Sequence, residues 1–285
     1  MRPESDGVLG EGTVVREVLT GRGYRGIGIP RYIGGMPKKP LSQPLKIPER
    51  PVFTAFEEKE DFWMVPGYER NLPHWRLAGA SYFVTFRLAD SLPAEVILRW
   101  KQDEAQWLFE RGVNIRWQRD EPERFRQAIA GLDCGERATF QREMARQFFV
   151  ELDECHGCCA LREPDAHALV AEALRFFHGQ RLWVGDFVVM PNHVHVIAQP
   201  FEEVPLEEWL YSVKRFTAAR LMQREDLRER LMTRAGRVWQ PESFDRVIRD
   251  LDELRRTREY IEKNPRGLRM GEFHLHRAEW IDALL

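Results

Sequence analysis

The chain has 285 residues, with 43 Lys+Arg against 45 Asp+Glu and a formal net charge of −2. Its hydrophobic content of 43% suits a globular protein and excludes wholesale disorder, and four cysteines are too few for a disulfide scaffold. No apolar run approaches the roughly 18 residues that span a bilayer, and the N-terminus lacks an apolar signal core, so we expect a cytoplasmic protein with no membrane partner.

Residues 1–70 are expected to form a flexible N-terminal arm. The first 50 residues hold 9 of the 20 glycines and 6 of the 17 prolines, and their apolar residues show no sustained period. Glycine and proline at this density interrupt helices and strands alike. The folded domain is therefore predicted to cover residues 71–285.

The first predicted strand covers residues 81–88, which are rich in aromatic and β-branched side chains. A helical insertion of about residues 93–160 is expected to follow. Residues 94–111 combine many charges with an apolar stripe behind a starting proline, and residues 119–153 also have a helical pattern.

The next predicted element is an amphipathic helix at residues 165–178, with Asp165 as its N-cap. Two β-rich runs follow at residues 181–190 and 193–199, separated only by the turn-forming Pro191-Asn192. Because the runs are short and closely spaced, we expect them to be antiparallel neighbours.

The last predicted elements are an amphipathic helix at residues 206–224, a short strand at 243–248 and a helix at 250–263. Asp250 is expected to cap the last helix, since Glu253 follows at the spacing of a capping box. The helix is predicted to end before Asn264, because a residue that precedes proline resists the helical conformation.

Without the insertion, the predicted order is β-α-β-β-α-β followed by a final helix. This order is typical of a ferredoxin-like α+β fold, in which one antiparallel sheet has helices on one face. The insertion follows the first strand, and the final helix is a C-terminal addition.

His193 and His195 flank Val194 at the start of a predicted strand, so strand alternation directs both imidazoles to one face. Two neutral imidazoles placed in this way can bind one divalent cation. A short His-x-His pattern taken alone is more often a pair of polar side chains that line a sheet face.

Several motifs in a fixed order make residues 71–273 resemble the single-tyrosine HUH transposases, in particular the branch of REP-associated tyrosine transposases. The motifs are NLPHW at 71–75, YFVTFR at 82–87, VVMPNHVHVI at 188–197, SVKRFTA at 212–218, VWQPESFDRVIRD at 238–250 and YIEKNP at 260–265. The N-terminal arm has no counterpart in the resemblance, and the insertion is matched poorly.

The resemblance implies an enzyme of DNA transposition and recombination, which cleaves and rejoins single-stranded or hairpin DNA through a 5′-phosphotyrosine intermediate. It makes Tyr260 the nucleophile of the catalytic helix, and His193, His195 and Asn264 the ligands of Mg²⁺ or Mn²⁺. Without the resemblance, Tyr260 is an ordinary half-buried aromatic residue and Asn264 a common helix exit before Pro265. The sequence offers no evident general base for the tyrosine.

A basic excess surrounds the predicted nucleophile, since residues 212–270 carry 16 Lys+Arg against 10 Asp+Glu. Single-stranded DNA is bound by cations that follow its phosphates and by aromatic rings that stack on its bases. The predicted DNA-binding residues are Lys214, Arg215, Trp239, Arg246, Arg249 and Arg256. About half of the arginines in this region are expected to form structural pairs instead, and Trp239 is equally suited to the core.

Two other functions are also compatible with the sequence. The first is a catalytically silent module that binds hairpin DNA on the same fold, although such a module has no need of the complete set of tyrosine, histidines and asparagine. The second is a zinc-bearing interaction protein. Cys155 and Cys158 have zinc-like spacing and stand beside His156 and Cys159, but no second Cys-x-x-Cys follows, and Cys134 could complete a site only through the fold. The DNA target and the choice between monomer and homodimer are not determined by the sequence.

Overall fold

The computed structural model describes residues 51, 53 and 79–285, so nearly all of the predicted arm and the motif at 71–75 lie outside the described residues. The elements in chain order are β1 (Tyr82–Arg87), α2 (Ala94–Glu110), α3 (Trp117–Asp120), α4 (Pro122–Ala130), α5 (Cys134–Asp153), the 3₁₀ helix η1 (Ala160–Arg162), α6 (Pro164–Arg175), β2 (Leu182–Val189), β3 (His193–Pro200), α7 (Leu206–Leu221), α8 (Glu225–Ala235), β4 (Phe244–Val247), α9 (Leu251–Lys263), β5 (His274–His276) and α10 (Glu279–Asp282). No helix in this part of the chain is long and apolar enough to cross a membrane.

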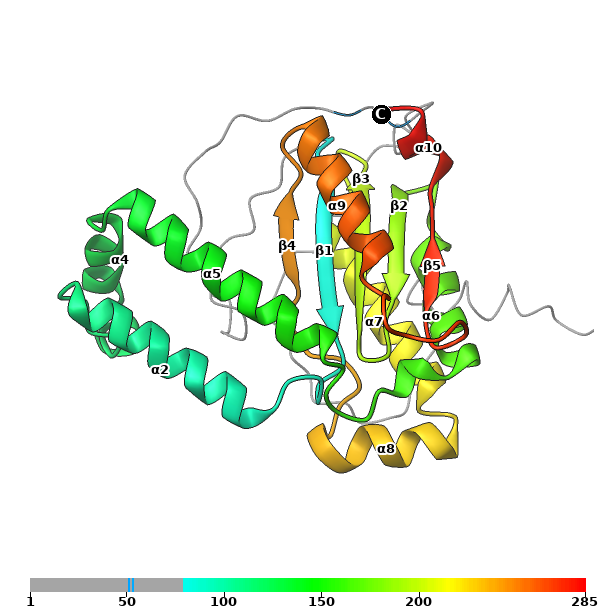
Figure 1. The fold of residues 1–285 in the computed structure, drawn as a ribbon, viewed down its shortest axis with the longest axis horizontal. Coiled ribbons are helices and arrows are strands. Elements are labelled where there is room, and N and C mark those ends of the chain that lie inside the picture. The colour runs from blue at the N-terminus through cyan, green and yellow to red at the C-terminus, as the bar shows by residue number, and fades with distance from the viewer. Residues whose placement is uncertain (1–50, 52, 54–78) are drawn as a thin grey trace, which may run out of the picture.

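The five strands form one antiparallel sheet in the order β4-β1-β3-β2-β5 (Figure 1). The first four strands have the arrangement of the predicted ferredoxin-like unit, and β2 and β3 are antiparallel neighbours across the tight turn, so the predicted α+β class is confirmed. Strand β5 extends the sheet beside β2. It was not predicted, because three residues are too few to show a period.

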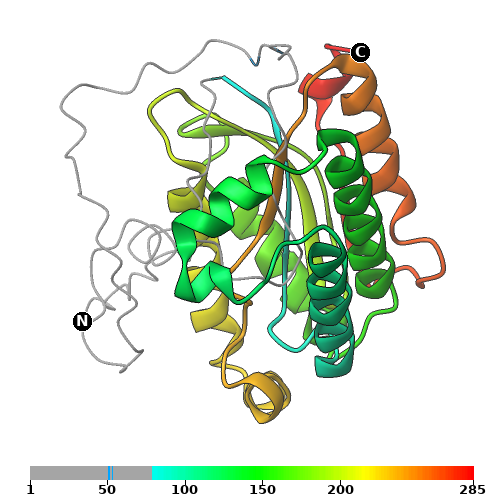
Figure 2. The same ribbon diagram turned by 90° about the vertical axis from the view of Figure 1, so that its left-hand side faces the viewer.

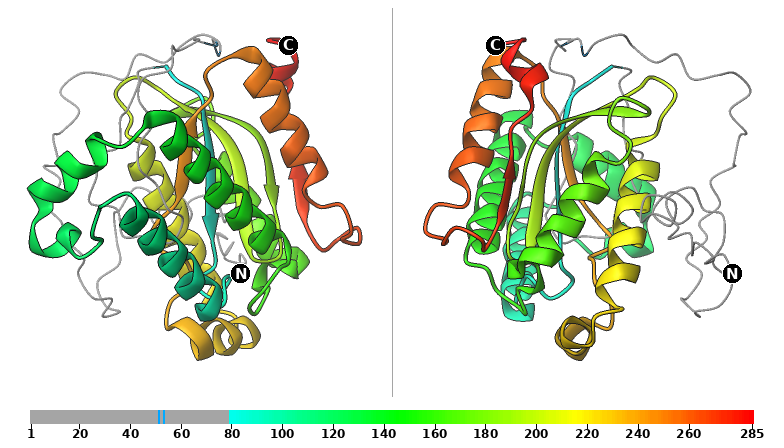
Figure 3. Two further views of the ribbon diagram at one scale, coloured as in Figure 1. Left: turned by 60° about the vertical axis from the view of Figure 1, so that its left-hand side comes forward. Right: turned by 90° about the vertical axis from the view of Figure 1, so that its right-hand side faces the viewer.

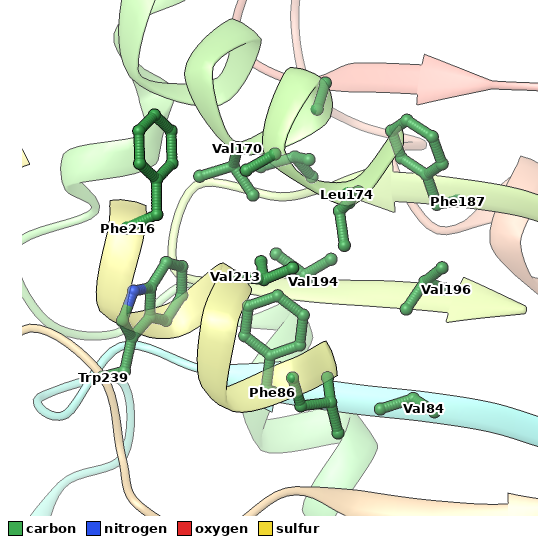
Figure 4. Packing of buried hydrophobic residues seen from close by; sticks show 14 of the residues in the cluster. Val84, Phe86, Val170, Leu174, Phe187, Val194, Val196, Val213, Phe216 and Trp239 are labelled. Atoms are coloured by element: carbon green, nitrogen blue, oxygen red, sulfur yellow. The ribbon is translucent and has the colours of Figure 1, made fainter. Parts of the chain in front are cut away.

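One face of the sheet is covered by α6 and α7, as expected for the two connecting helices (Figure 3). Val84 and Phe86 of β1 lie beside Val194 and Val196 of β3, and all four side chains are buried in one apolar cluster with residues of α6 and α7. Figure 4 shows Val213 of α7 among these side chains. This face is the main hydrophobic core.

The opposite face is covered by α9, α10 and the C-terminal half of α5 (Figures 1 and 3). Its apolar cluster joins Phe83 of β1 and Ile197 of β3 to Leu254 and Ile261 of α9, with Phe149 of α5 packed against them. Helices therefore cover both faces. The polar residues of the candidate site lie on this second face.

The helices of the insertion, between β1 and α6, project from the sheet. Helices α2 and α5 lie side by side, and α3 and α4 form the tip (Figures 1 and 2). Trp100 of α2 packs with Met144 and Phe148 of α5 in a small separate core. The helical pattern predicted over residues 119–153 is interrupted twice, before Pro122 at the start of α4 and at the turn before α5.

Of the two predicted helix caps, one is confirmed and the other is wrong. Asp250 caps α9 as predicted, since its carboxylate accepts a hydrogen bond of 2.6 Å from the Glu253 backbone N–H. Asp165 does not cap α6. That helix begins at Pro164, with Glu163 as N-cap and Asp165 inside the first turn. A proline at the first helical position fixes the start more strongly than the carboxylate that follows it.

Candidate functional site

The two histidines of the His-x-His motif lie side by side on β3, and strand alternation points both of them at the α9 face. His193 Nε2 lies 2.9 Å from His195 Nε2, and both side chains are fully buried. Val194 points the other way, into the main core. The predicted common orientation of the two imidazoles is therefore what the structure shows.

Hydrogen bonds to the second ring nitrogen hold each imidazole in place. His193 Nδ1 lies 2.7 Å from Asn192 Oδ1, and the amide nitrogen of Asn192 donates to the His156 carbonyl at 3.1 Å. The second bond orients the amide so that its oxygen accepts a hydrogen bond from the Nδ1–H of His193, which leaves Nε2 of His193 with a free lone pair. His195 Nδ1 lies 2.7 Å from the Thr85 hydroxyl of the neighbouring strand.

Burial keeps both imidazoles neutral. Loss of water lowers the pKa of His193 to about 3. The pKa of His195 is lowered well below its ordinary value by the same burial and, to a smaller extent, by the neighbouring His193. A neutral imidazole is the form that donates a lone pair to a metal ion.

Tyr260 and Asn264 reach the histidines from α9. The Tyr260 hydroxyl lies 3.3 Å from His195 Nε2, and the Asn264 amide nitrogen donates to that hydroxyl at 3.2 Å. Although Asn264 precedes Pro265, it keeps helical dihedral angles (φ −56°, ψ −41°), and its N–H donates to the Tyr260 carbonyl at 2.9 Å. The last residue of α9 is Lys263, as predicted, but the proline does not turn Asn264 away. Its side chain stays one helical turn from Tyr260.

Aromatic rings surround the tyrosine and one histidine. Phe83 stacks on His195 with ring centroids 5.4 Å apart and meets the Tyr260 ring edge to face at 6.0 Å. Phe149 of α5 lies 5.9 Å from Tyr260 and 5.7 Å from His195. Burial raises the pKa of Tyr260 above its ordinary value of 10, and the charge of Asp153 adds to the effect, so the phenol is protonated at neutral pH.

Asp153, the last residue of α5, is a site residue that the sequence did not reveal. Its Oδ1 accepts a hydrogen bond of 2.8 Å from the Asn264 amide nitrogen and lies 3.9 Å from His193 Nε2. Partial burial raises the pKa of this carboxyl to about 6. Asp153, His193 and His195 form a group whose ligand atoms all lie within 4.8 Å of one another, and no second group of this kind exists in the described ranges.

The donor set at the site fits a divalent cation. Two ligand nitrogens about 2.1 Å from one ion and at a right angle would be about 3.0 Å apart, close to the 2.9 Å between the two Nε2 atoms. Asn264 Oδ1 is buried and has no hydrogen-bond partner, as a ligand atom that faces an ion would. The predicted ligands His193, His195 and Asn264 are therefore brought together, with Asp153 beside them.

Structural partners occupy Trp239 and Lys214, which were both predicted to bind DNA. Trp239 is only 6% exposed, and its ring N–H donates to the Thr217 hydroxyl at 2.9 Å, so the core alternative describes it and its ring is not free to stack on a base. The Lys214 ammonium donates to the backbone carbonyls of residues 240, 241 and 242 at 3.0–3.4 Å. It stabilises the loop that leads into β4.

The predicted DNA-binding arginines do not share one surface. Arg246 and Arg249 pair with Glu253 at 3.1 and 3.4 Å, respectively, and Arg256 is exposed on the same helix as that glutamate. Arg215 is exposed on α7. Because α7 and α9 cover opposite faces of the sheet, Arg215 and Arg256 lie on opposite sides of it.

The cysteines do not gather into a zinc site. Cys134 begins α5 and Cys155 follows its end, about 30 Å away along a 20-residue helix. Near the end of that helix, the Cys159 thiol donates to the Cys155 carbonyl at 2.8 Å, and Cys158 lies 3.6 Å from an Asp90 carboxylate oxygen. Cys134 therefore cannot complete the site that the spacing suggested.

Comparison with known proteins gives little further information. No family model matches the chain, and no curated protein matches it. One solved structure to which the chain is similar is described as a REP-associated tyrosine transposase bound to a REP hairpin. The likeness covers 69% of this chain and 73% of the other, with 12% sequence identity and a TM-score of 0.34. The fold and the site therefore rest on this chain's own residues.

Proposed function

We propose that the protein is a transposase-like enzyme that cleaves and rejoins single-stranded hairpin DNA through a 5′-phosphotyrosine intermediate at Tyr260. One observation carries the proposal. The Tyr260 hydroxyl lies 3.3 Å from His195 Nε2, across 65 residues of sequence, and that nitrogen lies 2.9 Å from His193 Nε2. A nucleophile and two neutral metal-binding groups therefore meet in one cluster, in the chain that carries the transposase-like motifs.

The reaction needs an attack by the Tyr260 phenol oxygen on a DNA phosphorus atom. A P–O bond to tyrosine forms, the P–O3′ bond breaks, and the 3′-hydroxyl leaves with a proton. Because the phosphotyrosine keeps the bond energy, a 3′-hydroxyl can later attack it and rejoin a strand. A divalent ion, Mg²⁺ or Mn²⁺, held by His193, His195 and Asn264 would polarise the phosphate and offset the charge on the leaving oxygen.

The residues around the tyrosine suit this task. The Asn264 amide nitrogen already donates to the phenol oxygen at 3.2 Å, and a hydrogen bond of this kind stabilises the phenolate that the attack requires. The rings of Phe83 and Phe149 lie about 6 Å from the tyrosine ring and restrict its orientation. We place the DNA against the α9 face, where Arg246 and Arg256 are exposed and Arg249 is partly exposed.

A covalent-capture experiment tests the proposal. The purified protein is incubated with Mn²⁺ and a pool of labelled hairpin oligonucleotides that carry randomised single-stranded flanks. We expect a labelled protein band that survives denaturation, disappears with a chelator and is absent in Tyr260→Phe. Tyr211→Phe is the matched control, since that phenol is exposed on α7 and should leave the band unchanged.

Two results would contradict the proposal in different ways. A band of equal strength in Tyr260→Phe would remove Tyr260 as the nucleophile. Binding of hairpins without any covalent band, in either Mg²⁺ or Mn²⁺, would favour the catalytically silent binding module.

A further inference from the structure

We infer that Asp153 is an additional, anionic ligand of the divalent ion, which makes the helical insertion a part of the active site. The inference rests on the proposed function only in that it takes His193 and His195 as ligands of the same ion. Asp153 belongs to α5 of the insertion, so neither the His-x-His strand nor the tyrosine helix supplies it.

The carboxylate of Asp153 lies beside the two imidazoles. Its Oδ1 lies 3.9 Å from His193 Nε2, and all ligand atoms of Asp153 and the two histidines fall within 4.8 Å of one another. The same oxygen accepts the 2.8 Å hydrogen bond from the Asn264 amide nitrogen, which fixes its direction. An oxygen held beside two imidazole lone pairs is placed as a further corner of the coordination site that His193, His195 and Asn264 form.

The surroundings of Asp153 leave its negative charge uncompensated. Asp153 ends α5, where the negative end of the helix dipole disfavours a carboxylate, and α5 has no basic residue in its last turn. The acidic Glu154 follows directly. Within residues 79–285, the group that faces Asp153 as an ion-pair partner is His193, which burial keeps neutral. A divalent cation would supply the positive charge that this carboxylate lacks.

A bound dication would in turn need a negative charge from the protein. His193, His195 and Asn264 are all neutral donors, so a dication bound by them alone would be buried with no protein counter-charge, which is costly. One carboxylate reduces that cost, and two imidazoles with one carboxylate are an established donor set for first-row divalent metals.

The insertion is tied to the same site by a second contact. The loop that follows α5 offers the His156 carbonyl to the amide of Asn192 at 3.1 Å, and Asn192 in turn holds His193 Nδ1 at 2.7 Å. Residues 153–156 therefore contact the site directly through a carboxylate and indirectly through the orientation of one imidazole. Outer contacts of this second kind fix the direction of a ligand.

The inference is tested by metal binding in the absence of DNA. Mn²⁺ is titrated into the full chain and free Mn²⁺ is followed by its electron paramagnetic resonance signal. Asp153→Asn keeps an oxygen that accepts from Asn264 but removes the charge, and we expect it to raise the Kd for Mn²⁺ by roughly tenfold or more, since even outer partners of ligands contribute about 10–100-fold. Glu154→Gln, which removes the neighbouring charge, should leave the Kd within about twofold of the wild-type value.

A second variant separates ligation from mere positioning. Asp153→Cys should add, on binding Cd²⁺, a sulfur-to-metal charge-transfer band in the ultraviolet beyond any that the free thiols of Cys155, Cys158 and Cys159 give in the wild-type protein, because a thiolate in the ligand sphere prefers soft ions. Melting temperatures without metal show that each variant is folded. An unchanged Mn²⁺ affinity in Asp153→Asn, a missing Cd²⁺ band in Asp153→Cys, or a wild-type protein that binds no Mn²⁺ would each overturn the inference.

The outcome is separable from that of the proposed function. Weaker Mn²⁺ binding in Asp153→Asn together with no DNA adduct in the wild type would uphold the ligand and reject the nuclease. An adduct at Tyr260 with unchanged Mn²⁺ affinity in Asp153→Asn would uphold the nuclease and reject Asp153 as a ligand.

Discussion

The two faces of the sheet are built from alternate residues of the same strands, yet they contain different chemistry. Toward α6 and α7, strand β3 presents Val194 and Val196 to the main hydrophobic cluster. Toward α9, the same strand presents His193 and His195, which lie beside Tyr260. A shift of one residue in the register of β3 would exchange these two sets, because the side-chain period of a strand is two.

The two faces of the sheet are expected to have different roles, one in the stability of the fold and the other in the chemical reaction. The apolar face gains from the burial of hydrocarbon, at about 25 cal/mol per Å². The α9 face buries two imidazoles and an amide oxygen without a partner, and an unsatisfied polar group costs about 1–3 kcal/mol. We therefore expect variants of the first face to change folding, and variants of the second to change cleavage.

The largest expected effect comes from His195→Gln. The variant removes one metal-binding nitrogen next to Tyr260, so the rate of adduct formation should fall by about 1000-fold, the equivalent of the several kcal/mol that a metal ion contributes. Hairpin affinity, measured without metal by fluorescence anisotropy, should change by less than about threefold, because phosphate contacts dominate it. A parallel loss of cleavage and affinity would mean that the histidine has a structural role.

Phe216→Ala tests the opposite face. The ring is buried in the apolar cluster, and its removal should lower the free energy of unfolding by about 3–5 kcal/mol in urea titrations. The folded fraction at low temperature should form the DNA adduct at the wild-type rate. A variant with normal stability and lost cleavage would break the separation between the two faces.

Trp239→Phe has a smaller expected effect. It removes the hydrogen bond to Thr217 and should destabilise the protein by about 1–3 kcal/mol. Hairpin affinity should stay the same, because the ring lies in the core. A loss of about 1–3 kcal/mol of binding free energy would instead be the signature of base stacking and would restore the sequence prediction.

The smallest expected effect comes from Arg256→Ala and Arg215→Ala, which compare the two faces directly. In Arg256→Ala, the loss of one phosphate contact on the α9 face should make the slope of the logarithm of the DNA-binding constant against the logarithm of the salt concentration less negative by about 0.7–0.9. Arg215→Ala, on α7, should leave that slope unchanged. A changed slope in Arg215→Ala with an unchanged slope in Arg256→Ala would place the DNA against the α7 face.

Local patterns in the sequence were enough for the parts of the fold that depend on local chemistry. Aromatic and β-branched runs predicted β1, β2 and β3, and alternation predicted that His193 and His195 share a face. The cap at Asp250 was also readable from its spacing to Glu253. In each case the determining partners are close in sequence.

The missed features depend on contacts between distant segments. Asp153 became a site residue only because α5 folds back onto the sheet, and residue 153 and its partner Asn264 are 111 positions apart. The pairs of Arg246 with Glu253 and of Lys214 with the carbonyls before β4 likewise join different elements. A count of charges along the chain cannot distinguish such structural pairs from cations that are free to bind DNA.

We propose that the α9 face holds a tyrosine nucleophile in a metal-dependent site. The most direct test is mass spectrometry of tryptic peptides from the covalent adduct formed with Mn²⁺ and hairpin DNA. We predict a nucleotide attached through its 5′-phosphate to Tyr260. A nucleotide found on Tyr211, which is 63% exposed on the α7 side, or on any residue other than Tyr260, would contradict the account.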